Sequence, residues 1–128
     1  MYVVSVQAHY DSAHFLRHYK GKCERLHGHR YVVEVALATD ELNRSGLAFD
    51  FVDVKKHLRE LAERLDHQNI NELPPFTELE PSAENQARYF FDELKHRLPG
   101  AMAAAMLYTR VWETPTQWAQ YSERSVVL

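Results

Sequence analysis

Three histidines at short spacing have the types and positions needed for metal chemistry. His27 and His29 flank a single glycine, and in a strand the side chains at i and i+2 point to the same face, roughly 6.6 Å apart along the backbone. Two imidazoles in that arrangement converge on one metal ion at about 2.0–2.1 Å from each nitrogen. His14, expected at the end of the preceding strand, can reach the same ion from a neighbouring position. Three histidines that leave one coordination position open are typical of catalytic zinc.

The same histidines also have an ordinary interpretation, as residues of a polar loop or surface. Gly28 lies between two of them, where a missing side chain permits close backbone approach or a bulge. The third histidine strengthens the metal interpretation without deciding the question.

Cys23, the only cysteine, lies four residues before His27. A lone cysteine is by default a small buried hydrophobe. Here Lys22 and Arg25 flank it, and nearby cations lower the pKa of a thiol towards the reactive thiolate. The surrounding basic loop, residues 15–26, can bind an anionic substrate or can be a solvated charged loop.

Asp66 and His67 form a second candidate pair. An aspartate orients an imidazole, which can then exchange protons with a thiol. Adjacent side chains rarely hydrogen-bond each other directly, so on the residues alone a polar helix end is the better explanation of the pair.

Two glutamates are candidate ligand-binding residues. Strand alternation puts Glu113 on the same face as Val111 and Leu107, where a carboxylate can accept two parallel N–H bonds from a guanidine-like ligand edge. Exposure to solvent at a strand end is the alternative. Glu84, two residues after Ser82 at an expected helix start, is explained mainly by the helix dipole.

The elements that must position these residues follow from periodicity. Alternating, β-branched segments predict strands over 2–9, running towards His14, and over 29–38. Helical spacing predicts a helix over 51–65 with Asp50 as N-cap, and a second from Ser82 to Pro99-Gly100. Two further strands are expected at about 105–113 and 117–127. This β-β-α-α-β-β order predicts an α+β fold with a four-stranded antiparallel sheet and two helices on one face.

Composition limits the class of protein. The 128 residues fit one domain, 1–128, and 15 Lys and Arg against 18 Asp and Glu give no basic field for nucleic acid or membrane. One cysteine, no signal peptide and no apolar span of about 20 residues predict a cytoplasmic protein. Two exposed edge strands favour a homo-oligomer.

The ordered motifs together resemble the family of 6-pyruvoyltetrahydropterin synthases and bacterial 6-carboxytetrahydropterin synthases, over nearly the whole chain. The segments that carry the resemblance are Ser12-Ala-His14, Cys23-Glu-Arg-Leu-His27-Gly-His29, Gly46-Leu-Ala-Phe-Asp50-Phe51, Leu65-Asp66-His67, Pro81-Ser-Ala-Glu84-Asn85 and Val111-Trp-Glu113-Thr114.

The resemblance implies specific roles for these residues. It implies Zn²⁺ on His14, His27 and His29, and proton transfer by Cys23 with an Asp66–His67 pair that comes from a neighbouring subunit. It implies that Glu113 anchors the pterin, with Glu84 a weaker candidate in the same pocket. It also implies the tunnelling fold (T-fold), in which trimers close a β-barrel and two trimers form a hexamer.

Three residues between Cys23 and His27 are the spacing associated with the 6-carboxytetrahydropterin branch of queuosine-precursor synthesis. The activity implied is a zinc-dependent lyase that converts 7,8-dihydroneopterin triphosphate to 6-carboxy-5,6,7,8-tetrahydropterin, acetaldehyde and triphosphate. The alternatives are a 6-pyruvoyltetrahydropterin product, made without carbon–carbon cleavage, and a non-catalytic pterin- or zinc-binding protein. On charge alone, Lys20, Lys22 and Arg25 are candidates for the triphosphate, and Arg30 departs from the small polar residue common after the last histidine.

Overall fold

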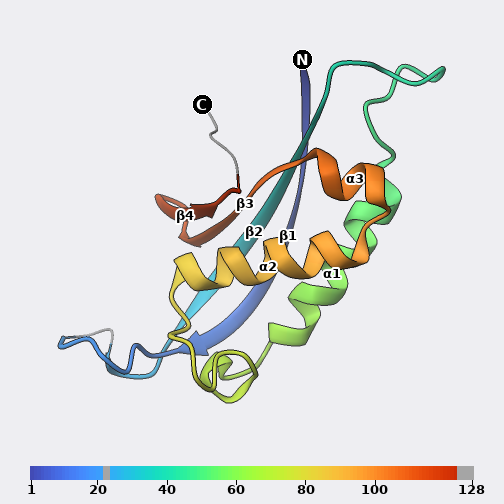
Figure 1. Cartoon of the computed structure of the whole chain (residues 1–128). Helices are drawn as coiled ribbons and strands as arrows, with labels where there is room; N and C mark the ends of the chain where they lie inside the picture. The colour runs from blue at the N-terminus through green and yellow to red at the C-terminus, as the bar shows by residue number, and fades with distance from the viewer. Residues whose placement is uncertain (22–23, 124–128) are drawn as a thin grey trace.

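The computed structural model describes residues 1–21 and 24–123 and contains one antiparallel sheet. Its strands lie in the order β1-β2-β3-β4, so β1 and β4 are the edges. Helices α1 and α2 pack across one face, and Figure 1 shows them in front of the sheet. The strands are β1 (Tyr2–His14), β2 (His27–Thr39), β3 (Met106–Thr114) and β4 (Gln117–Tyr121), and the helices are α1 (Phe51–Leu65), the single turn η2 (Ile70–Glu72), α2 (Ala83–Arg97) and α3 (Gly100–Ala105).

Side-chain caps fix where the two long helices begin. The Asp50 carboxylate accepts the Val52 N–H at 2.9 Å, and the Ser82 hydroxyl accepts the Asn85 N–H at 3.2 Å. Each cap satisfies one of the N–H groups that have no partner within the helix. The α+β class, the helix starts and the helices' shared face are therefore confirmed.

The structure differs from the sequence prediction at the chain's second half. A short helix, α3, follows Pro99 instead of a direct passage into a strand, because the segment is rich in alanine, the strongest helix former. Strand β4 ends at Tyr121, short of the predicted 127. There the chain leaves the ladder and the Ser122 hydroxyl donates to the Leu107 carbonyl at 2.8 Å. Residues 124–127 of the predicted strand lie outside the described residues.

The core lies between the sheet and the helices. Tyr10 and Tyr31, paired across β1 and β2, are both fully buried and stack with ring centroids 5.0 Å apart. On the other face, Trp112 and Trp118 are partners across β3 and β4, 6.0 Å apart, and the Arg110 guanidinium lies 3.9 Å over the Trp118 ring. Among the described residues no helix has the length and apolarity to cross a membrane.

One end of the sheet collects the segments that matter for chemistry. The end of β1, the start of β2, the start of α2 and the loop from His67 to Pro81 meet there, at the lower left of Figure 1. The Ser12 hydroxyl donates to the Leu65 carbonyl at the end of α1, and the Ala13 N–H donates to the Gln68 carbonyl at 3.0 Å. These bonds join the end of α1 directly to the end of β1.

Candidate active site

The three predicted histidines converge at the joined ends of β1 and β2. His14 is the register partner of His27, and His29 lies two residues further along β2, opposite Ser12. One ring nitrogen from each of the three lies within 4.8 Å of the others, and the Nε2 atoms of His14 and His27 are 3.0 Å apart. The strand pairing therefore brings the three imidazoles together as predicted.

Two backbone carbonyls fix the proton positions on His14 and His27. The Nδ1 atom of His14 lies 2.6 Å from the Pro81 carbonyl, and that of His27 lies 2.7 Å from the Arg25 carbonyl. A carbonyl only accepts hydrogen bonds, so both Nδ1 atoms carry a proton, and in the neutral imidazole Nε2 then presents a lone pair. Two lone pairs facing each other at 3.0 Å repel unless a cation lies between them.

His29 completes a donor set that suits zinc. Its Nε2 atom is buried and has no hydrogen-bond partner among residues 1–21 and 24–123. Burial lowers the pKa of both His14 and His29, and the neighbouring His27 lowers each further. His14 and His29 are therefore held in the neutral form that binds metal. Nitrogens at tetrahedral zinc, about 2.0–2.1 Å from the ion, are roughly 3.3 Å apart. The Nε2 atoms of His14 and His27 are 3.0 Å apart.

Gly28 does not act as predicted. The strand shows no bulge at this position, and a Cβ atom there would lie 3.6 Å from the Ser12 carbonyl, an ordinary contact. Contacts among the described residues therefore give no steric reason for a glycine at this position.

Glu113 lies beside the histidine cluster and lines a cavity with Glu84. Its carboxylate is 3.8 Å from His29 Nε2, and the two glutamates line one cavity of about 420 Å³ at the start of α2 and along β4. The predicted face is only partly right. Val111 belongs to the core, but Leu107 packs with Ala36 and Tyr108 because a bulge opposite Ala36 and Leu37 breaks the alternation.

Asp66 and His67 do form a direct pair, contrary to the expectation for adjacent residues. His67 has a positive φ of 56°, which turns its ring back so that Nδ1 lies 2.8 Å from Asp66 Oδ2. The other carboxylate oxygen accepts the Asp11 N–H at 2.8 Å, while the His67 N–H donates to the Asp11 carbonyl at 2.7 Å. The Asp11 N–H and the His67 bond lower the pKa of Asp66. The carboxylate therefore stays ionised and holds the proton on Nδ1, which leaves Nε2 as the acceptor.

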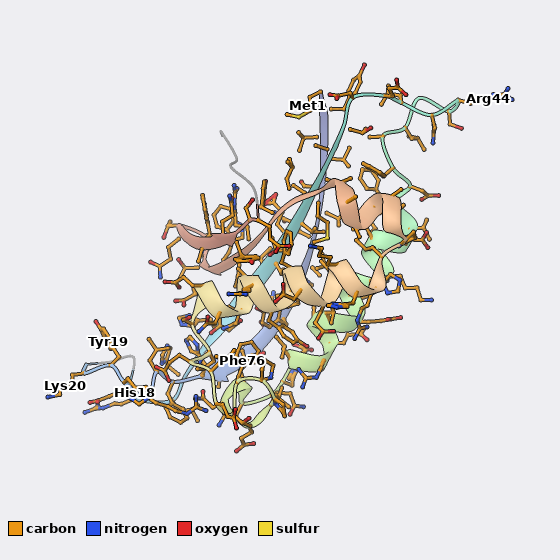
Figure 2. The ribbon with its side chains drawn as sticks, in the orientation of Figure 1. Met1, His18, Tyr19, Lys20, Arg44 and Phe76 are labelled. Carbon is orange, nitrogen blue, oxygen red and sulfur yellow. The ribbon has the colours of Figure 1, made fainter. Side chains whose placement is uncertain are left out.

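The candidate thiol, Cys23, and Lys22 lie outside the described residues. Of the described loop cations, Arg17 is occupied, since its guanidinium donates to the Phe76, Asn71 and Leu79 carbonyls. Figure 2 shows Tyr19 and Lys20 at the outer tip of the loop. Arg25 is exposed, and Arg30 is bound through two nitrogens to the Asp11 carboxylate at 2.8 and 3.0 Å.

Two groups near the metal site were not identified from the sequence. One is the Pro81 carbonyl, which accepts His14, and the other is Gln86, whose buried amide donates to the same carbonyl at 2.9 Å. The one sequence signal for Gln86 is its position, a glutamine among the apolar residues that α2 buries.

The sequence model described as 6-pyruvoyl tetrahydropterin synthase matches residues 3–124. The chain belongs to this family. Within it, 6-carboxy-5,6,7,8-tetrahydropterin synthase of Aquifex aeolicus is 36% identical over 124 residues, covering 80% of this chain and 76% of that protein. The Haemophilus influenzae protein of the same name is 30% identical and covers 96% of this chain and 100% of its own.

Solved structures agree on the fold. The 6-pyruvoyl tetrahydropterin synthase of Caenorhabditis elegans superimposes with a TM-score of 0.83 at 25% identity, covering 97% of this chain and 98% of that one. The Plasmodium falciparum structure of the same name gives 0.69 at 21% identity, covering 94% and 96%. The subunit fold expected from the resemblance, a four-stranded antiparallel sheet with helices on one face, is therefore confirmed.

Proposed function

We propose that this protein is a zinc-dependent 6-carboxy-5,6,7,8-tetrahydropterin synthase. It converts 7,8-dihydroneopterin triphosphate to 6-carboxy-5,6,7,8-tetrahydropterin, acetaldehyde and triphosphate, a step of queuosine-precursor synthesis. The observation that carries the proposal is the pair of facing Nε2 lone pairs beside a third orphaned histidine nitrogen. The proposal is supported by full-length relatives that bear this enzyme's name.

His14, His27 and His29 hold the zinc in the proposed mechanism. A bound zinc ion with an open coordination position polarises substrate hydroxyls and stabilises developing negative charge. The carbonyls of Pro81 and Arg25 keep two of the three rings in the tautomer that binds metal. The neutral state of His14 and His29, favoured by burial, avoids competition between protons and the ion.

Glu113 and Glu84 bind the pterin in this proposal. The cavity that they share lies next to His29, so a ring system held there has its side chain near the metal site. The Glu113 carboxylate accepts two N–H groups from the amino-pyrimidinone edge, a charge-assisted contact of the strong bidentate kind. Glu84 lies in the first turn of α2 and is exposed, which suits a weaker contact.

Cys23, His67 and Asp66 move protons in the proposed reaction. The Asp66–His67 pair has the geometry of an oriented base, with Nδ1–H bound to the carboxylate and Nε2 free to take a proton. The role of Cys23 rests on its sequence position between Lys22 and Arg25. His67 is largely exposed, which suits a thiol that reaches it from a second subunit.

The proposed assembly is a homohexamer built from two trimers. Strands β1 and β4 are both sheet edges within one chain, and pairing β4 of one copy with β1 of the next removes both edges. Native mass spectrometry tests the assembly, and a monomer at working concentration would contradict it.

One assay separates this function from its rivals. The zinc-loaded protein is incubated with 7,8-dihydroneopterin triphosphate and the products are identified by mass spectrometry. Carboxypterin with acetaldehyde is the expected result. A pyruvoylpterin product would instead assign 6-pyruvoyltetrahydropterin synthase, the name carried by the structurally similar C. elegans protein, and unchanged substrate would indicate a pterin- or zinc-binding protein without catalysis.

A further inference from the structure

A glutamine amide lies fully buried beneath the metal site, in the first turn of α2. Gln86 has no exposed surface, although the α2 face on which it lies is otherwise apolar. Burying an amide is costly unless its donors and acceptor are satisfied. Both ends of this amide are bonded, to groups on two different elements.

The bonding pattern fixes which way the amide points. Its one end lies 2.9 Å from the Pro81 carbonyl, which only accepts, so this end is the NH₂ group. The other end is then the oxygen, and it accepts the Tyr10 hydroxyl at 2.6 Å. Burial raises the pKa of Tyr10 well above its usual value, so the hydroxyl keeps its proton and remains a donor.

The Pro81 carbonyl connects this amide to the metal site. It accepts Nδ1–H of His14 at 2.6 Å on one side and the Gln86 amide on the other, so both of its lone pairs are used. The preceding carbonyl, that of Glu80, is held by the neighbouring Asn85 side chain at 2.9 Å. Two consecutive side chains of α2 therefore fix two consecutive carbonyls of the loop that precedes it.

We infer that Gln86 is a positioning residue of the metal centre. Its amide holds the Pro81 carbonyl where that carbonyl receives Nδ1–H of His14, and so fixes the orientation and tautomer of this ligand. The inference rests on the proposed zinc site. Partners that orient a metal-bound histidine typically affect metal affinity by about 10–100-fold, and a group one bond further out belongs at the lower end of that range.

A purely structural role for Gln86 makes a different prediction. In that case the glutamine only satisfies the Tyr10 hydroxyl, and removing both polar groups together leaves an apolar core that binds zinc as before. The double variant Tyr10→Phe/Gln86→Leu tests this, because it removes the amide together with the Tyr10 hydroxyl that the amide accepts. Tyr10→Phe alone is the matched reference, since it keeps the Gln86 donor.

A second control corrects for lost stability. The Thr109 hydroxyl is buried and donates to the Ala87 carbonyl of the same helix at 2.5 Å, with no bond to the histidines. Thr109→Val therefore removes a comparable buried hydrogen bond to α2 at a position away from the site.

The experiment measures zinc dissociation constants by chelator competition and records the absorption spectrum of the Co²⁺-substituted proteins. We expect the double variant to bind zinc roughly tenfold more weakly than Tyr10→Phe, with altered cobalt ligand-field bands, while Thr109→Val matches the wild type in both. Equal affinity and identical bands in Tyr10→Phe and the double variant would overturn the inference alone. A wild-type protein that binds no zinc would overturn the proposed function as well.

Discussion

The histidine cluster and the Asp66–His67 pair are built in opposite ways. His14 is 2% exposed, and its ring is bonded on one side to a backbone carbonyl within the same chain. The His67 side chain is 79% exposed, and within the described part of the chain its ring is bonded through Nδ1 alone. Both regions hold an imidazole in a defined tautomer, the first by buried carbonyls and the second by an exposed carboxylate.

The difference indicates what each region still needs. The cluster has its three nitrogens within one chain. The pair holds the His67 ring through Nδ1, and the ring is largely exposed. In the proposed mechanism its Nε2 atom therefore acts on a group that a second subunit brings to it. A metal site assembled by strand register can therefore form in a single subunit, whereas proton transfer at His67 is expected to depend on assembly.

Removing a metal ligand should have the largest effect. His14→Ala takes away one of three nitrogens, and the several kcal/mol of charge stabilisation that the zinc supplies are lost, which corresponds to more than about 10³-fold in turnover. Zinc content by atomic emission should fall together with activity. His96→Ala, which removes an exposed histidine of α2, is the control; full zinc content in His14→Ala would refute the ligand assignment.

Removing the exposed base should separate catalysis from metal binding. His67→Ala is expected to lower kcat by roughly 10²–10³-fold, within the range of general acid–base catalysis, while zinc content stays at the wild-type level. Glu63→Gln replaces an exposed residue near the end of α1. It should leave both kcat and zinc content unchanged. If His67→Ala lost zinc as well, the two regions would not be independent.

Replacing Glu113 should affect substrate binding more than metal binding. Glu113→Gln keeps the shape but removes the charge, and hydrogen bonds to charged groups contribute about 1.5–3 kcal/mol, so kcat/KM should fall by roughly 10–100-fold, mainly through KM. Glu84→Gln in the same cavity should have a smaller effect. Steady-state kinetics on the two variants decide, and an unchanged KM in Glu113→Gln would remove Glu113 from the pterin site.

The two regions should also differ in the pH at which their contribution to the free energy of unfolding is lost. This is the smallest of the expected effects. In the metal-free protein the pKa of His14 lies below its usual 6.5, so its contribution is complete above about 6.5 and is lost as the pH falls towards the lowered value. The pKa of Asp66 lies below its usual 3.8, so its contribution persists until the pH falls below about 3.8.

Urea unfolding across pH measures this contrast. His14→Gln should flatten the decline that begins near pH 6.5, and Asp66→Asn should flatten only the decline at the acidic end. The opposite assignment, with Asp66→Asn altering the stability near pH 6, would contradict the titration argument.

The sequence predicts the parts of the site that depend on local periodicity. The spacing of His27 and His29 and the position of His14 before them are enough to place three imidazoles on one face once the strands pair in register. Asp50 and Ser82 act as helix caps as expected, because capping depends on residues within one turn.

The parts that could not be predicted depend on tertiary contacts or on single backbone angles. The direct Asp66–His67 bond requires the positive φ of His67, a backbone conformation that few non-glycine residues adopt even though histidine is enriched there. The displacement of Leu107 comes from a bulge, and a bulge depends on the pairing of β3 with β2. Gln86 is linked to His14 only through a carbonyl of the preceding loop, a contact made by folding.

The tryptophan pair of the hairpin gives the molecule a built-in optical reporter. Trp112 and Trp118 are the only two tryptophans. Trp112 lies on β3, and Trp118 lies beside it on the edge strand β4, under the Arg110 guanidinium. Their emission therefore follows the environment of that edge. In the proposed assembly, dilution that separates subunits should change this fluorescence, which would allow subunit exchange to be followed without a label.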